Sequence, residues 1–402
     1  MPTLQSLKQT ATKRADVEVP KQELKPRICM PTTRNFGRRA FQCGLYECQD
    51  VLTETDAVDM ICLEPGAGFR FKERWQRRLM YRDVSRSLIY LNPGFRKVRL
   101  NQDYDLFIAV CQNYRDLLCL NAIDGWQDRC KTSVCWIEEL WAAQIPYYKY
   151  WLHALRRFDH VFIGYKDTVA PLSNAIGRAC HWLPAAVDAL RFSPYPVPPA
   201  RVIDVYSVGR RNDAIHRALL QAAERGEIFY IYDTLQGADM QVYSHKEHRN
   251  HYANITKRSR YFMVAPAKTG EMDETRGQVD VGYRFYEGAA AGAVLLGQPP
   301  SCDSFRELFP WSDAVVQIQP DGSDVRDVLA GLASEPERVS AISRRNAVEL
   351  VLRHDWVYRW KEMFRVAGIE PSPRMVERER RLRDLAEMAN TASQGTLASR
   401  KV

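Results

Sequence analysis

The pattern that most limits the fold of this chain is an alternation of short apolar runs with helical segments. Apolar runs such as DLFIAVC at 105–111 and HVFIGY at 160–165 alternate with segments of helical periodicity. The alternation stops at 192–200, FSPYPVPPA, with four prolines in nine residues, and restarts at 202–209. Continuous apolar runs between helices are typical of buried parallel strands. The sequence predicts an α/β fold with two doubly wound parallel-sheet domains.

Chain length and composition define the domain boundaries that we expect. A chain of 402 residues is too long for one ordinary core and fits two domains with additional terminal segments. The predicted parts are a flexible arm at 1–26, a first domain at 27–191, a proline-rich linker at 192–200, a second domain at 201–345, helices that cross back at 346–370, and a charged, partly disordered tail at 371–402.

The positions of the cysteines and the lengths of the apolar runs indicate the cellular compartment of the protein. Nine of the ten cysteines lie in the first half of the chain, without any CxxC pair, and several stand inside apolar runs. Reduced thiols behave there as small hydrophobes, so we expect neither disulfides nor a zinc ribbon. The longest apolar runs fall far below the roughly 20 residues of a membrane span. We expect a cytoplasmic protein.

Residues 281–297, VGYRFYEGAAAGAVLLG, place one carboxylate beside a helix of small residues and ahead of an apolar strand. Small residues allow a ligand or another backbone to approach closely. Glu287 at the mouth of such a helix could accept hydrogen bonds from sugar or ribose hydroxyls. The alternative is an ordinary step from helix to strand, in which the small residues pack on a sheet.

Positive charge is concentrated in residues 70–99, which contain ten Lys or Arg and two acids, Glu73 and Asp83. Such a segment could contact an acidic acceptor, anionic lipid headgroups or nucleic acid. A solvated helix is the favoured interpretation, since the aromatic residues are not interleaved as a stacking platform requires. Its predicted buried side is Trp75, Leu79, Met80, Val84 and Leu88.

Two acidic pairs occupy different ends of predicted strands. Glu138 and Glu139 follow a strand, so they should emerge at the carboxyl edge of the sheet, where a base could deprotonate an acceptor hydroxyl. They could equally be acids in the first turn of a helix. Asp103 and Asp105 precede a strand, which favours a solvated start of that strand over a metal-binding Asp-x-Asp motif.

Three histidines, His245, His248 and His251, are spaced three residues apart. No cysteine accompanies them and no HExxH motif is present. A structural or solvated role is therefore favoured over metal binding.

Four segments in a fixed order carry a family resemblance: WLPAAVDALRFSP at 182–194, DVYSVGRR at 204–211, RFYEGAAAG at 284–292 and RHDWVYRW at 353–360. This order resembles GT-B glycosyltransferases, specifically the group 1 glycosyltransferases of the CgeB-like branch. The chain departs from the pattern at Ala186, where glycine is usual. It also has Val279 where many retaining members have a second glutamate.

The resemblance implies two Rossmann-like domains that face a cleft, and transfer of a sugar from a nucleotide-diphosphate sugar to an acceptor hydroxyl by a hexosyltransferase-type enzyme. The site residues that we predict fall into three groups. They are the catalytic Glu287, Glu138 and Glu139, the donor-binding Gly209, Arg210, Arg211, Arg284, Glu287, Gly288 and Ala289, and the acceptor-side Arg34, Asn35 and Gly37.

The expected partners follow from this chemistry. A leaving diphosphate can be neutralised by arginines and a helix N-terminus, so we expect no metal and no cofactor besides the donor substrate. The expected acceptor is a glycan, a lipid-linked molecule or a small molecule, with a peripheral membrane contact through residues 70–99 and no nucleic acid. The alternatives are a non-catalytic nucleotide- or sugar-binding protein with a GT-B fold, and a UDP-sugar epimerase.

Overall fold

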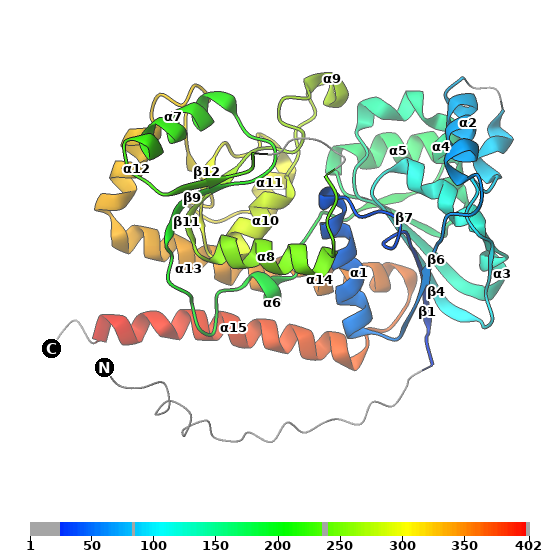
Figure 1. The fold of residues 1–402 in the computed structure, drawn as a ribbon. Helices are drawn as coiled ribbons and strands as arrows, with labels where there is room; N and C mark the ends of the chain where they lie inside the picture. Colours follow the sequence, from blue (N-terminus) through cyan, green and yellow to red (C-terminus); the bar gives the residue numbers. More distant parts are fainter. Residues whose placement is uncertain (1–24, 83–84, 235–239, 399–402) are drawn as a thin grey trace.

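Six parallel strands form the sheet of the first domain, in the order β2-β1-β4-β6-β7-β8. The structure is a computed structural model that describes residues 25–82, 85–234 and 240–398 (Figure 1). A short parallel pair, β3 with β5, lies outside the main sheet. The strands are β1 (Ile28–Thr32), β2 (Val58–Cys62), β3 (Val98–Arg99), β4 (Tyr104–Cys111), β5 (Ile123–Asp124), β6 (Cys130–Ile137), β7 (His160–Ile163) and β8 (Cys180–Trp182).

Alternate residues of the central strands serve two different cores. Leu106, Ile108 and Val110 of β4 face one apolar cluster, whereas Phe107 and Ala109 face the other. Because side chains alternate across a strand, a strand that is buried on both faces reads as a continuous apolar run. This explains why DLFIAVC identifies a central strand.

The helical elements of the first domain include several short 3₁₀ segments. The run YRDLLCLNA forms the longest of them, η3. The α-helices are α1 (Cys43–Thr55), α2 (Phe69–Tyr81), α3 (Trp126–Arg129), α4 (Lys149–Leu152), α5 (Val169–Ile176) and α6 (Ala189–Phe192). The 3₁₀ segments are η1 (Ala40–Gln42), η2 (Arg86–Tyr90), η3 (Tyr114–Ala122), η4 (Ala142–Tyr147), η5 (His153–Arg157) and η6 (Lys166–Thr168).

The basic segment forms α2, but its buried side differs from the prediction. Met80 is buried as expected and Leu79 and Leu88 are partly buried, whereas Trp75 is 45% exposed. Val84 lies outside the described residues. The prediction for Trp75 is wrong because Gln76 occupies the buried face, where its amide donates to the carbonyls of Leu88 and Leu91.

Five parallel strands form the second domain, in the order β10-β9-β11-β12-β13. The strands are β9 (Ile203–Ser207), β10 (Tyr230–Tyr232), β11 (Ser259–Val264), β12 (Val294–Gly297) and β13 (Val316–Gln317). The helices are α7 (Asp213–Glu224), α8 (His245–Lys257), α9 (Met272–Thr275), α10 (Tyr283–Ala290), α11 (Asp303–Leu308), α12 (Val325–Ser334) and α13 (Pro336–Arg353). The predicted α/β class, with two Rossmann-like parallel-sheet domains, is confirmed.

The C-terminal helices connect the two domains. Helix α14 (Trp356–Ala367) packs against α1 and β6 of the first domain. The indole of Trp360 donates to the carbonyl of Cys48 over 3.1 Å. The predicted boundary at 345 falls inside the continuous helix α13, so the second domain extends further than expected.

The tail predicted to be partly disordered is instead helical in the described residues. Helix α15 (Pro373–Ala398) runs along the underside of the molecule and packs on α13, α14 and α1 (Figure 1). Its buried apolar residues are Met375, Leu382, Ala386 and Ala389. Small and widely spaced apolar residues in a highly charged sequence gave a weak signal, so the prediction is wrong there. Most of the predicted N-terminal arm, residues 1–24, lies outside the described part.

One apolar cluster spans the junction of the domains. It includes Met30 and Trp136 of the first domain, Phe262 and Phe285 of the second, and Trp356 of α14. All ten cysteines lie in the described residues and are free thiols, as expected for reduced cysteines. Within the described residues, no helix combines the length and the apolar character needed to cross a membrane.

Candidate functional site at the domain junction

The order of the strands identifies where a ligand would bind in each domain. In the first sheet the chain goes from β1 to β2 on one side and then to β4 on the other. In the second sheet the same reversal places β9 between β10 and β11. Parallel α/β sheets bind ligands at the carboxyl ends of the strands, at the point of reversal. The loops after β1, β4, β9 and β11 therefore define the candidate site.

The loop after β9 depends on a glycine. Gly209 has a φ of +69°, and its N–H donates to Asp233 Oδ2 over 2.7 Å. A Cβ atom at this position would lie 1.8 Å from Nη2 of Arg284. Glycine is required both for the left-handed backbone and for the close approach of the guanidinium. The predicted donor residues Gly209 and Arg284 are therefore in direct contact.

The three predicted diphosphate-binding arginines differ in their partners. Arg210 is exposed and pairs with Glu271 at 2.6 Å. Arg211 donates to the carbonyl of Asp233 and lies over the ring of Tyr232. Arg284 forms no ion pair with any described residue, and its buried Nε lacks a hydrogen-bond partner there. Arg284 is consequently the arginine that is free to bind an anion.

The first turn of α10 supplies further donors. Its N-cap residue, Gly282, has no side chain that could accept from the N–H groups at the start of the helix. Such groups carry partial positive charge and favour anions. Arg284 lies in the same turn, so two sources of positive charge converge there.

Glu138 is a buried carboxyl at this junction, and its pKa is raised. It follows β6, as the sequence predicted, and only 9% of it is exposed. Burial raises its pKa to about 8, and the neighbouring carboxylates of Glu139 and Asp116 add to the rise. A carboxyl with a pKa near neutrality can accept and release a proton during a reaction.

Two polar groups adjoin Glu138, one from each domain. Gln112 follows β4, Tyr283 begins α10, and both partly offset the rise in the Glu138 pKa. Glu138 Oε2, Gln112 Oε1 and the Tyr283 hydroxyl all lack a hydrogen bond of ordinary geometry to any described residue. Buried polar atoms are nearly always satisfied. This cluster therefore indicates a place where a polar ligand binds.

Glu139, the second predicted base, has a different environment. It pairs with Lys268 at 3.2 Å and accepts from the indole of Trp141 over 3.2 Å. Lys268 lies in the loop after β11 and also pairs with Glu271 and Glu274. Burial lowers the pKa of this lysine, but the three carboxylates outweigh burial and raise it. Glu139 is thus an ion-pair partner across the junction, and Glu138 is the better candidate base.

Asp280 is a second buried carboxyl at the junction. It is 3% exposed, and Oδ1 accepts from the Ser304 hydroxyl and from the N–H of Val281. Its Oδ2 lacks a partner among the described residues. Burial raises its pKa to about 6.

Glu287 belongs to a buried ion-pair network. Its carboxylate pairs with Arg249 of α8 and accepts from the Tyr252 hydroxyl over 2.8 Å. Arg249 also binds Glu47 of α1, with Nε 2.7 Å from Oε2. Burial lowers the pKa of Arg249, but the two carboxylates raise it well above its ordinary value. The network joins α1 of the first domain to α8 and α10 of the second.

This placement corrects three predicted donor contacts. Both oxygens of Glu287 have protein partners and the residue is 4% exposed, so its carboxylate is not presented to a ligand. A Cβ at Gly288 would lie 2.5 Å from the ring of Phe262, and Ala289 is fully buried. The small residues pack α10 onto the sheet, which is the alternative that the sequence left open.

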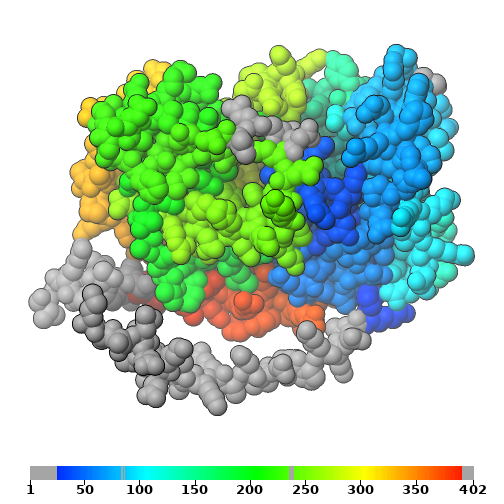
Figure 2. Space-filling model, in the orientation of Figure 1, coloured from blue at the N-terminus to red at the C-terminus, as the bar shows by residue number. Residues whose placement is uncertain are grey.

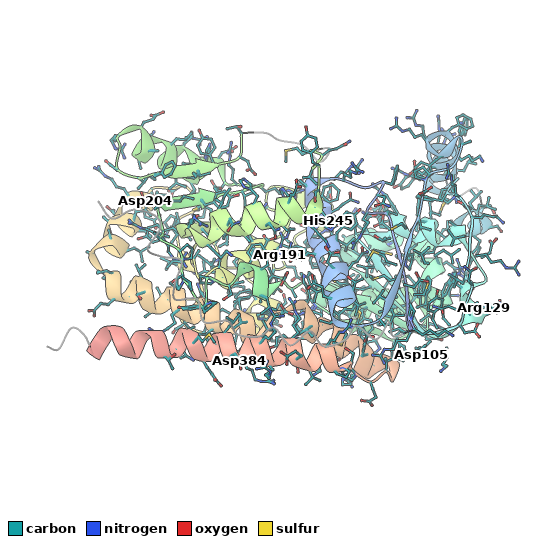
Figure 3. All side chains as sticks on the ribbon, turned by 60° about the horizontal axis from the view of Figure 1, so that its bottom comes forward. Asp105, Arg129, Arg191, Asp204, His245 and Asp384 are labelled. Carbon is teal, nitrogen blue, oxygen red and sulfur yellow. The ribbon has the colours of Figure 1, made fainter. Side chains whose placement is uncertain are left out.

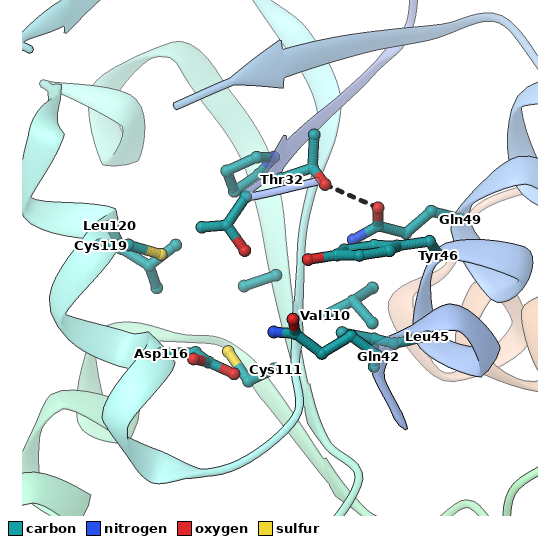
Figure 4. A pocket seen from close by; sticks show the side chains of 13 residues that line it. Thr32, Gln42, Leu45, Tyr46, Gln49, Val110, Cys111, Asp116, Cys119 and Leu120 are labelled. Atoms are coloured by element: carbon teal, nitrogen blue, oxygen red, sulfur yellow. Dashed lines mark hydrogen bonds between the residues drawn. The ribbon is translucent and has the colours of Figure 1, made fainter. Parts of the chain in front are cut away.

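A small pocket lies beside the ends of β1 and β4, next to the loop that contains the predicted acceptor-side residues, but Arg34, Asn35 and Gly37 do not line it (Figure 4). The side chains of Gln42, Tyr46 and Asp116 line it. Gly37 lies directly against Gln42 and Tyr46, since a Cβ there would lie 2.6 Å from the Tyr46 hydroxyl. Arg34 is tied to Asp50 at 2.7 Å, and Asn35 is exposed. Arg34 thus has a structural partner, and the acceptor role of this loop stays a prediction.

Figure 3 shows that the Asp-x-Asp segment lies apart from the junction, at the other end of the first domain. Asp103 pairs with Arg129, and Asp105 pairs with Lys131. Asp103 precedes β4 and Asp105 is the second residue of that strand, so both stand at the edge of the sheet opposite Glu138. The prediction of a solvated strand start is confirmed.

The histidine run lies on α8 at the junction. His245 pairs with Asp50 of α1 at 2.9 Å, and the pKa of His248 is lowered by burial. His245 thus has a structural role, as predicted. No group of three or more metal-ligating side chains that could hold an ion is present among the described residues.

The predicted site residues do not include several residues of the junction, among them Gln112, Arg249, Lys268 and Tyr283. Tyr283 stands next to Arg284 in the segment 281–297, so the sequence could have identified it as a site residue. Arg249 is 202 residues from its partner Glu47, and no local pattern connects the two. Lys268 follows an apolar strand, and a cation at the carboxyl end of a predicted parallel strand is a signal that the sequence contains.

The fold and the site define a two-domain α/β protein whose junction holds Arg284, which has no ion pair with a described residue, and the buried carboxyl of Glu138. A family model described as glycosyl transferase-like matches residues 210–365, from the loop after β9 into α14. The matched range contains Arg210, Arg211 and Arg284. This match supports the predicted glycosyltransferase class for the second domain.

The structure is similar to solved glycosyltransferases at low sequence identity. One is an alpha-glucosyltransferase in complex with UDP-glucose and DNA, with 10% identity, a TM-score of 0.49, and coverage of 86% of this chain and 100% of the other. Another is an alpha,alpha-trehalose-phosphate synthase (UDP-forming) from Burkholderia xenovorans, with 13% identity, a TM-score of 0.45, and coverage of 75% and 76%. No curated protein sequence matches the chain.

Proposed function

We propose that the protein transfers a sugar from a nucleotide-diphosphate sugar to an acceptor hydroxyl at the domain junction. The observation that carries this proposal is that consecutive residues of α10 serve both sides of the site. Tyr283 adjoins Glu138 of the first domain, and Arg284 adjoins Gly209 of the second. The glycosyl transferase-like match over residues 210–365 supports the reaction class.

The diphosphate would bind at Gly209, Arg284 and the N-terminus of α10. Glycine allows the backbone of the loop to approach the phosphates, and Arg284 has no competing carboxylate among the described residues. As the bond from the anomeric carbon to the diphosphate oxygen breaks, negative charge grows on the leaving group. Fixed positive groups stabilise that charge without reorganising.

The acceptor would approach from the first domain. Its hydroxyl oxygen forms the new bond to the anomeric carbon, and its proton passes to the carboxylate of Glu138. Gln112 and Tyr283 would hold the acceptor through polar atoms that form no hydrogen bond of ordinary geometry with a described residue. The loop with Arg34, Asn35 and Gly37 borders this side.

Independence from metal ions is part of the proposal. The support is the presence of arginine and helix N-terminal donors where the diphosphate would lie. We assign Asp103 and Asp105 no part in the reaction, because they stand at the opposite edge of the sheet. The order of the four motifs supports placement in the CgeB-like branch, with a carbohydrate or lipid-linked acceptor in the cytoplasm.

The proposal is tested by incubating the protein with UDP-, GDP- and dTDP-glucose and measuring release of the nucleoside diphosphate. We expect slow hydrolysis of at least one donor, with an unchanged rate in excess EDTA. Complete loss of turnover on chelation, restored by Mg²⁺ or Mn²⁺, would contradict metal independence. Binding without turnover would indicate a non-catalytic binding protein, and formation of an epimeric nucleotide sugar would indicate an epimerase.

A further inference from the structure

Helix α2 presents a face of aromatic and basic side chains to solvent. Phe71 is 66% exposed and Trp75 is 45% exposed. Their rings contact each other, with centroids 5.9 Å apart. Large apolar side chains of this kind are usually buried, so two adjacent exposed rings on one helix indicate an interaction surface.

Basic residues surround the two rings. At 3.6 residues per turn, Phe71, Trp75, Arg78 and Arg82 follow one stripe of the helix, with Arg74 beside it. All three arginines are exposed, and none pairs with a carboxylate of a described residue. The Arg78 guanidinium lies 5.9 Å from the centre of the Trp75 ring.

The opposite side of α2 holds the helix in place. Met80 is buried, and Gln76 donates to two backbone carbonyls. Glu73 is turned from the exposed stripe and pairs with Arg77 at 2.8 Å. The exposed stripe therefore carries positive charge without a neighbouring acid among the described residues, and substitutions there do not disturb the core.

The position of α2 connects it to the acceptor side of the molecule. The helix follows β2 and begins at the carboxyl edge of the first sheet, and it lies at an outer corner of the surface (Figure 2). Phe36 of the loop after β1 packs edge-on against Phe69, the first residue of α2, with ring centroids 5.0 Å apart. A surface that contacts α2 would therefore also lie beside that loop.

Aromatic rings among arginines suit one kind of partner. Anionic lipid headgroups attract basic side chains, and Trp and Phe rings partition into the interface of a bilayer. Single-stranded nucleic acid instead requires rings spaced along a groove. The two rings of α2 are adjacent on a convex helix, which favours a lipid surface.

We propose that α2 docks the protein reversibly on an anionic membrane surface. Phe71 and Trp75 enter the headgroup region, while Arg74, Arg78 and Arg82 contact lipid phosphates. Two rings and a few charges give weak binding that depends on salt, as expected for a peripheral contact. The inference concerns a surface outside the site, so it holds or fails independently of the proposed transfer reaction.

The test is co-sedimentation of the full-length protein with vesicles of phosphatidylcholine alone or with about 30% phosphatidylglycerol. We expect binding only to the anionic vesicles, with most of it lost when salt is raised to ~1 M. The triple variant Arg74→Glu, Arg78→Glu, Arg82→Glu should bind roughly 100-fold more weakly. The double variant Phe71→Ser, Trp75→Ser should also bind more weakly at low salt.

Two matched controls come from the second domain. Phe229 is 55% exposed and Arg217 is exposed on α7, so Phe229→Ser and Arg217→Glu should bind vesicles as the unmodified protein does. Thermal unfolding establishes that each variant is folded. Equal binding to neutral and anionic vesicles, or unchanged binding of the α2 variants, would overturn the proposal. Binding of a single-stranded DNA oligonucleotide in preference to anionic vesicles at ~0.15 M salt would also overturn it.

Discussion

At the scale of single residues, the chemistry of the junction depends on which side chains lack a partner. Glu138 and Arg284 are both partly or fully buried and have polar atoms without hydrogen bonds to described residues. Neighbouring groups of the same type, Glu139 and Arg210, are neutralised by ion pairs. From residue type and strand position alone, all four were equally good candidates for the site. They differ only in whether a neighbouring side chain forms an ion pair with them.

The raised pKa of Glu138 predicts a characteristic pH dependence of activity. A base must be ionised, so the rate of transfer or donor hydrolysis should rise with pH up to about 8 and then level off. Glu138→Gln should lower the rate at pH 8 by about 100-fold or more and remove this rise. Glu139→Gln is the matched comparison and should keep the rise. The measurement is initial rate against pH for the three proteins.

The same group affects stability. The pKa of Glu138 is higher in the folded protein than the ordinary value of 4.5, so the folded state holds the proton over a range where the unfolded chain has lost it. The free energy of unfolding should therefore fall as pH rises from 4.5 to about 8. Urea unfolding of Glu138→Gln should show a shallower fall. An equally steep fall would mean that other groups, such as Asp280, dominate.

Arg284 should bind the diphosphate more strongly than Arg210 does. A hydrogen bond to a charged group contributes about 1.5–3 kcal/mol, so Arg284→Ala should weaken binding of the nucleoside diphosphate roughly 10- to 100-fold. Binding of the nucleoside alone should change little. Arg210→Ala is the control, with a smaller loss because Glu271 already holds that side chain. Calorimetric titration with UDP and uridine distinguishes these outcomes, and equal losses for both ligands would contradict the assignment.

At the scale of elements, α1, α8 and α10 are joined by the buried network of Glu47, Arg249 and Glu287. Additional donors reach Glu47 from the N–H of Asp188 and the indole of Trp356. A buried charge that loses a partner is costly, even where the complete pair contributes little net stability. The network therefore determines how the two domains meet.

Glu287→Ala should destabilise the protein by about 3–5 kcal/mol, because Arg249 would keep only one of its carboxylates. The measurement is urea unfolding. Glu377→Ala removes an exposed ion pair with Arg380 on α15 and should cost less than about 1 kcal/mol. Should Glu287→Ala keep its stability and lose donor binding, the carboxylate would be a donor ligand, as the sequence first suggested.

At the scale of the whole molecule, α15 and the shared apolar cluster make one unit of the two domains. Arg378 of α15 is 5% exposed and pairs with Asp355 at 2.7 Å and with Asp188 at 2.6 Å. Ser372, just before α15, donates to the backbone carbonyl of Thr55 in the first domain. We expect thermal unfolding in a single transition, although the chain has two sheets.

Removing Arg378 tests this coupling. Arg378→Ala leaves Asp188 and Asp355 buried without their common cation, and it should lower the free energy of unfolding by about 3–5 kcal/mol. Arg381→Ala, at an exposed position of the same helix, should have little effect. The measurement is differential scanning calorimetry. Two separate transitions in the unmodified protein would show that the domains unfold independently.

The layered architecture can be predicted from local patterns in the sequence. The apolar runs that became β4 and β7 are continuous because both faces of each strand are buried, and the prolines at 194–199 cannot extend either sheet. These are local properties, so they can be read without the fold. The position of Glu138 at the carboxyl edge followed from the same logic, since a parallel strand has a defined direction.

The pairing of side chains, in contrast, depends on contacts between distant segments of the folded chain. Glu287 meets Arg249, Trp75 remains in solvent while Gln76 is buried, and the charged tail forms α15 on the underside of both domains. Each outcome depends on a contact between segments far apart in the chain, and the hydrophobic periodicity of a single segment does not predict such a contact. Burial of a face is encoded locally, whereas the pairing of charges is determined by how the two domains and the last helices come together.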